Sequence, residues 1–134
     1  MLKKRELASV AGALAAAAIA VYLGTAHRLY DIPGLEGHIV RTVVLRKIAS
    51  VVVFAALAVV LDVVAARLKR ELRVIDGALL VGAVSALIEI VQDLRGSTEG
   101  LLWNLGDVIL GAAGGAIGVM LAARSRARRL RGRR

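Results

Sequence analysis

Three acidic residues lie inside apolar runs of this sequence, and they are the side chains best placed to do chemistry. Glu89 and Gln92 interrupt the run "SALIEIVQD", Asp107 lies in "GDVILGAAGGAIG", and Asp62 lies near the end of a third run. At helical spacing Ser85, Glu89 and Gln92 share one face. A carboxylate inside an apolar helix is costly, so it usually faces the interior of a helix bundle and finds a partner there. We therefore expect these residues to meet a cation, a hydrogen-bond donor or a ligand.

The composition indicates that the surrounding medium is lipid. The 134 residues are 58% hydrophobic and 3% aromatic, contain no cysteine, and have a mean hydropathy of +0.73. Four apolar segments have about the length needed to cross a bilayer as helices. They span about residues 7–24, 48–66, 77–94 and 101–123. The sequence predicts an all-α membrane protein, a four-transmembrane-helix bundle that forms a single domain over residues 1–134.

The positions of Lys and Arg predict the orientation. Of the 19, three precede the first segment, four lie in the second connection and seven follow the fourth segment, so fourteen share one side if both termini are cytoplasmic. Because cytoplasmic loops carry the excess of Lys and Arg, we expect both termini inside the cell (inner or plasma) membrane of a bacterium. An alternative is that the first segment is a signal peptide cleaved near Gly24–Ala26, which leaves three spans with the C-terminus still inside.

The first connection, residues 25–47, is long and holds the single proline. Asp31 followed by Pro33 is typical of a helix start. The apolar residues Leu35, Ile39 and Val43 then fall on one helical face, which predicts a short helix at the membrane interface. The alternative is a helical extension of the 48–66 segment.

The last segment of the chain, residues 124–134, is a basic tail with seven arginines. Beside a membrane, each basic residue contributes roughly 1 kcal/mol of attraction to anionic lipid. We expect this tail to lie in the cytoplasm and to contact anionic membrane lipids. We expect no nucleic-acid binding, since the tail has no aromatic residue for base stacking.

A stripe of glycines follows Asp107 on one face of the last apolar segment. It contains two Gly-xxx-Gly spacings, Gly111–Gly115 and Gly114–Gly118. Small residues let helix backbones approach closely in lipid, so the stripe predicts a helix-packing face.

The segments "SALIEIVQ" and "DVILGAAGGAIG" resemble the second half of the VanZ-like family, whose pattern is Glu-x-x-Gln on one helix and Asp-x-x-x-Asn-x-x-Gly on the next. The matching residues are Glu89, Gln92, Asp107, Gly114 and Gly118, and Gly111 stands at the Asn position. The family's earlier motif, Asp-Lys-x-x-His-x-x-x-Tyr, fits "RKIASVVVF" in spacing. Lys47 matches there, whereas Arg46, Ser50 and Phe54 replace the other three residues. The resemblance covers about residues 46–120. It implies four spans, both ends inside, and an association with glycopeptide (teicoplanin) resistance at the cell envelope.

In this topology seven polar residues converge on the outer half of the bundle. They are Lys47, Ser50, Ser85, Glu89, Gln92, Arg95 and Asp107. One hypothesis is an outward-facing pocket that binds the polar head of an envelope lipid or a glycan or glycopeptide-type ligand. The alternative is a structural network that pairs Glu89 with Lys47 or Arg95, and Asp107 with Gln92 or Asn104.

Two further expectations concern partners and reactivity. Asp62 should pair with Arg67 or Lys69 at the cytoplasmic end, or extend toward the interface. Neither histidine lies in a span, and no nucleophile lies beside a base, so we expect no enzymatic activity, no metal site and no cofactor. A different class of function, a non-catalytic subunit of a larger membrane complex that packs against another membrane protein or itself, is kept as the alternative.

Overall fold

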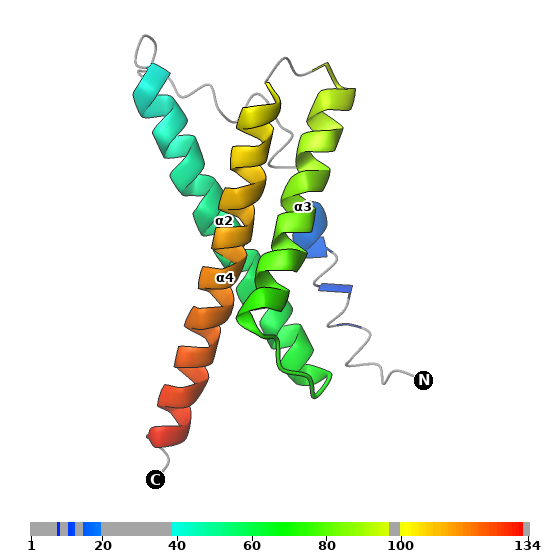
Figure 1. Cartoon of the computed structure of the whole chain (residues 1–134). Coiled ribbons are helices and arrows are strands. Elements are labelled where there is room, and N and C mark those ends of the chain that lie inside the picture. The colour runs from blue at the N-terminus through cyan, green and yellow to red at the C-terminus, as the bar shows by residue number, and fades with distance from the viewer. Residues whose placement is uncertain (1–7, 9–10, 13–14, 20–38, 97–99, 133–134) are drawn as a thin grey trace.

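Three long helices make up most of the structure, a computed structural model (Figure 1). It describes the backbone of residues 8, 11–12, 15–19, 39–96 and 100–132, and the side chains of these residues apart from 39–43. The helices are α2 (Ile39–Arg67), α3 (Val74–Leu94) and α4 (Leu101–Arg131). All regular secondary structure in these described ranges is helical.

Helix α4 is the centre of the bundle. It packs along both α2 and α3, whereas α2 and α3 contact each other only sparsely. The chain runs down α2, up α3 and down α4, so α2 and α4 are parallel and α3 is antiparallel to both (Figure 1). The loop at Leu68–Arg73 and the last turns of α4 therefore share one end of the bundle, which we call the basic end because both are rich in Lys and Arg.

Each of the three helices is long and apolar enough to cross a membrane. Large apolar side chains point outward from all three, such as Val52 (62% exposed), Leu79 (66%) and Ile109 (60%). An exposed apolar surface of this extent would be a liability in water but is the surface that lipid tails cover. The fold is thus all-helical, with three helices fit to span a bilayer.

The expected first span lies mostly outside the described residues. Its described part, residues 8, 11–12 and 15–19, has helical backbone, and Ala16 and Ala17 pack against the buried core of the bundle. The count of four spans, the side on which the N-terminus lies, and the alternative of a cleaved signal peptide stay predictions.

Two helices are longer than the sequence segments predicted. Helix α2 begins at Ile39, so residues 39–47 extend the 48–66 segment instead of forming a separate interfacial helix. The proposed start of that interfacial helix, at Asp31 and Pro33, lies outside the described residues. Helix α4 continues to Arg131, so most of the basic tail is helical. The reason is that residues 119–131 contain neither Gly nor Pro and are rich in Ala and Arg, which favour helix.

The connection between α2 and α3 is fixed by local backbone chemistry. Lys69 takes a left-handed conformation with φ 57°, and the Arg70 N–H bonds the Ala65 carbonyl oxygen at 2.9 Å, which closes the end of α2. Helix α3 then begins where the Asp76 carboxylate accepts a hydrogen bond of 3.0 Å from the Arg73 N–H. The Arg73 guanidinium donates two more bonds to the same carboxylate, at 3.1 and 3.0 Å.

The glycine stripe of α4 lies at both helix interfaces. On the α2 side, a Cβ on Gly114 would lie 2.9 Å from the carbonyl oxygen of Val51, and one on Gly118 would overlap the carbonyl oxygen of Ala55. Real Cβ atoms do not approach carbonyl oxygens this closely. The backbones of α2 and α4 are therefore in direct contact, and the side chain of Phe54 packs beside Gly114.

The other two glycines of the stripe, Gly111 and Gly115, face α3. A Cβ on Gly111 would lie 2.8 Å from Oγ of Ser85, and one on Gly115 would lie 2.9 Å from Cβ of Val81 and overlap the backbone of Gly77. Because residues i and i+4 share a face of a helix, Gly111 and Gly115 form one contact line and Gly114 and Gly118 form the other. Glycine at these four positions lets α4 pack tightly against two helices at once.

We predict that Gly118→Ala destabilises the protein and that Gly106→Ala does not. The added methyl group at Gly118 meets the α2 backbone, which cannot move without separating the helices, and such overpacking costs about 1–3 kcal/mol. At Gly106 no atom lies within 4 Å of the added group, and alanine favours the helix. Thermal unfolding in mild detergent measures both. Equal melting temperatures for the two variants would contradict the close packing.

Candidate functional site

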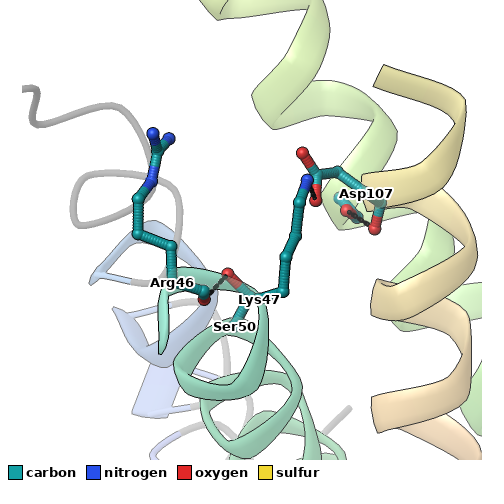
Figure 2. A network of polar contacts seen from close by, with 5 residues as sticks. Arg46, Lys47, Ser50 and Asp107 are labelled. Atoms are coloured by element: carbon teal, nitrogen blue, oxygen red, sulfur yellow. Dashed lines mark hydrogen bonds and ion pairs between the residues drawn. The ribbon is translucent and has the colours of Figure 1, made fainter. Parts of the chain in front are cut away.

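The first polar contact between helices is an ion pair that joins α2 to α4. Nζ of Lys47 bonds Oδ1 of Asp107, and Figure 2 shows Lys47 reaching across to Asp107 while Arg46 points away. The two side chains are 25% and 21% exposed. Nζ also lies 5.6 Å from the centre of the Trp103 ring, one turn before Asp107, close enough for a cation–π attraction.

Helix α3 joins this ion pair through a serine. The Ser85 hydroxyl, which is buried, donates a 3.0 Å hydrogen bond to the backbone carbonyl oxygen of Asp107. Glu89 follows one turn later on the same face and is 8% exposed. One turn after Glu89 on α3 is Asp93, whose two carboxylate oxygens accept hydrogen bonds of 3.1 and 3.3 Å from Nδ2 of Asn104 on α4.

These contacts determine which turn of α4 lies opposite Glu89. Ser85 lies beside Gly111 and Asp107, and Asp93 lies beside Asn104, so the antiparallel register puts Glu89 opposite the turn of α4 between Asn104 and Asp107. We call Lys47, Ser85, Glu89 and Asp107 the polar cluster. It lies at the end of the bundle opposite the basic end (Figure 1).

The partners within this region differ from those expected for a structural network. The structure shows Lys47 as a partner of Asp107, whereas the structural-network alternative gives Lys47 to Glu89. Asn104 bonds Asp93. Asp107 takes the lysine because α2 and α4 are in direct contact, which carries the long Lys47 side chain across their junction.

The other predicted site residues lie at the margin of the cluster. The Ser50 hydroxyl donates to the Arg46 carbonyl oxygen of its own helix at 2.9 Å (Figure 2). Gln92 lies about one turn after Glu89 on α3 and is half-buried. Arg95 lies where α3 ends and is exposed. The structure thus joins Lys47, Ser85 and Asp107 directly and leaves Arg95 at the surface.

A second ion pair joins α2 to α4 at the basic end. Asp62, whose side chain is 2% exposed, bonds Nη1 of Arg126 through Oδ2. From the sequence we considered Arg67 and Lys69 as partners and did not consider Arg126, which the structure shows bonded to Asp62. The reason is that α4 continues as a helix beyond residue 123, which carries Arg126 down the α2 interface.

A signal for this pair was present in the sequence. Lys47 precedes Asp62 on α2, and Asp107 precedes Arg126 on α4, so two parallel helices present opposite charges in reversed order. The sequence does not predict the Asp62–Arg126 pair directly, because Arg126 belongs to an arginine-rich end that is typical of a solvated tail and not of a helix face.

The polar cluster offers hydrogen-bond donors and acceptors and charges of both signs. Within the described ranges, no three His, Asp or Glu side chains lie close enough together to hold a metal ion. The Ser50 and Ser85 hydroxyls both donate to backbone carbonyls. The cluster consists mainly of the partly exposed Lys47–Asp107 pair and the buried carboxyl group of Glu89.

The fold and the cluster together define the class of protein. It is an all-helical protein with three helices fit to cross a membrane and with charged groups held between those helices. Comparison with protein-family models, with curated proteins and with solved structures gave no match to this chain. The VanZ-like resemblance therefore stays a prediction that rests on the motif residues themselves.

We predict that exchanging the charges of the first ion pair largely preserves the fold. Lys47→Asp or Asp107→Lys alone places like charges together at the α2–α4 junction, whereas the double exchange restores attraction. Contacting charged residues typically show coupling energies of about 0.5–3 kcal/mol, and we expect a value in this range. Unfolding in detergent of both single variants and the double variant measures it.

Arg128→Asp makes the same change of charge at an exposed position on α4 and serves as the control. Strictly additive effects of the two single substitutions at Lys47 and Asp107 would mean that the pair does not hold α2 against α4.

Proposed function

We propose that this chain is a multi-pass protein of the bacterial cell membrane that binds the polar head of an envelope lipid or glycan precursor at the polar cluster. The observation that carries the proposal is the partly exposed Lys47–Asp107 pair beside the buried Glu89. A fully buried ion pair leaves no access for a third group, whereas this one is about a quarter exposed. An incoming phosphate can replace the Asp107 carboxylate at the Lys47 ammonium, and an incoming hydroxyl can hydrogen-bond to either partner.

The charge distribution supports an outward-facing cluster. The loop at Leu68–Arg73 and the end of α4 carry nearly all Lys and Arg of the described residues beyond residue 60, and both lie at the basic end. The positive-inside rule puts such an end in the cytoplasm. With that orientation, the polar cluster faces the outside of the membrane, the side on which the envelope lies.

The chemistry of the cluster fits a ligand with both an anionic group and hydroxyl groups. Lys47 supplies a compact positive charge for a phosphate or carboxylate, aided by the ring of Trp103. The carboxyl groups of Asp107 and Glu89 accept hydrogen bonds from hydroxyl or amide groups of a sugar or peptide. The resemblance of these segments to the VanZ-like pattern supports an envelope setting related to glycopeptide resistance.

We predict that Glu89→Gln and Asp107→Asn, each close in shape to the residue replaced, abolish complementation of a gene deletion in a screen of sensitivity to envelope-directed antibiotics. Binding of a lipid-linked glycan precursor to the purified variants should weaken about tenfold, because each loses a hydrogen bond to a charged group. Asp76→Asn is the matched control, since Asp76 only caps the start of α3 at the opposite end.

Two outcomes would count against the proposal. Variants that keep full activity in the screen and lose only thermal stability would show that the cluster serves packing alone. Recovery of the protein in a discrete heteromeric complex, with no binding by the isolated chain, would favour a role as a subunit. A cysteine introduced at Gly100 in this cysteine-free chain reports the side that the cluster faces, by labelling of intact cells with an impermeant maleimide.

A further inference from the structure

A groove between α2 and α4 lies at the basic end, away from the polar cluster. It has a volume of about 510 Å³, within the range of roughly 300–1,000 Å³ that is usual for ligand sites. Apolar side chains line one part of it, chiefly Val59, Val63 and Leu121. Arginines line another part, among them Arg126 and Arg129 from the last turns of α4, and Asp62 also belongs to the lining.

The depth of these residues matches one leaflet of a bilayer. The apolar part of α4 ends at Ala123, and Arg126 and Arg129 follow three and six residues later, about 4.5 and 9 Å further along the helix. Half the difference between the hydrocarbon thickness and the full thickness of a bilayer is roughly 5–8 Å. The Arg129 guanidinium therefore reaches toward the level of lipid phosphates, and Val59 and Leu121 lie at the level of acyl chains. The Arg126 guanidinium bonds Asp62, which lies between Val59 and Val63 on α2, so it lies at the boundary between the two levels.

The charge of the groove favours an anion. Its lining residues include three arginines and one aspartate, which leaves an excess of two positive charges. Among the described residues, Asp62 is the one hydrogen-bond partner of the Arg126 guanidinium, and it bonds Nη1 alone. A guanidinium has five N–H donors, and this side chain is 39% exposed, so it has donors to offer to a further acceptor.

Asp62 positions Arg126 instead of cancelling it. The carboxylate, which is buried on α2, bonds one nitrogen of the guanidinium and so holds the arginine at the α2–α4 junction. Arg129 is at i+3 from Arg126 on the same face of α4 and is exposed. A guanidinium held in place, with a second exposed arginine three residues later on the helix, suits a phosphate group, which arginine binds through paired N–H donors.

We propose that this groove is a binding site for one anionic glycerophospholipid of the adjacent leaflet. Its phosphate lies against Arg126 and Arg129, and an acyl chain lies along Val59, Val63 and Leu121. A soluble anion would use the arginines but not the apolar part, and a neutral lipid would use the apolar part but not the arginines. The combination of both at the matching depths selects an anionic lipid over either.

The test is native mass spectrometry of the full chain in mild detergent, titrated with phosphatidylglycerol or with phosphatidylcholine. We expect phosphatidylglycerol to bind the unaltered protein at least tenfold more tightly than phosphatidylcholine. Arg129→Gln should weaken phosphatidylglycerol binding about tenfold. Arg128→Gln, with the same loss of charge outside the groove lining, should leave it within about twofold.

A second pair of variants tests the apolar part without changing any charge. Val63→Phe fills the groove and should block lipid binding, whereas Val60→Phe, which faces away from the groove lining, should not. Equal losses for Arg128→Gln and Arg129→Gln would mean that the arginines attract lipid only as a diffuse charge, and the site would be refuted. Displacement of the lipid by inorganic phosphate, or retention of binding in Val63→Phe, would refute it as well.

Discussion

The contact of the α4 backbone with two neighbouring helices is the constraint on which the rest of the structure depends. In lipid, apolar side chains gain little by leaving the tails for another helix, so close packing and polar contacts have to hold helices together. Gly114 and Gly118 bring α4 against α2, and Gly111 and Gly115 bring it against α3. Without that approach, neither the Ser85 hydroxyl nor the Lys47 ammonium would reach Asp107.

The two ion pairs then fix how far α2 and α4 slide along each other. Lys47 meets Asp107 at one end and Asp62 meets Arg126 at the other, with the signs reversed. A shift of α4 by one turn, about 5.4 Å, would break both pairs together. Fifteen residues separate the pairs on α2 and nineteen on α4, about 22 and 28 Å of helix. These lengths approach the ~30 Å hydrocarbon core, so the charges lie near its two edges.

Sequence reasoning reached the helical class and the three described apolar helices because hydropathy alone determines them. It also identified Asp107 and the glycine positions, since a carboxylate in an apolar run and small residues at helical spacing can be recognised in the sequence itself. The partner of Asp107 was not visible, because which of several polar side chains lies opposite depends on the register between helices. Arg126 was not predicted as a partner for a related reason. An arginine-rich end is typical of a solvated tail, and only the structure shows that α4 continues through it.

The most direct test of the close packing is solid-state NMR of the isotopically labelled chain in lipid bilayers. It should detect a carbon–carbon correlation between Cα of Gly118 and the carbonyl carbon of Ala55, two residues that only the α2–α4 contact brings together. We predict a strong cross-peak at short mixing times. Correlations of Gly118 that are confined to its own helix would contradict the account, because the ion pairs and both proposed sites depend on that contact.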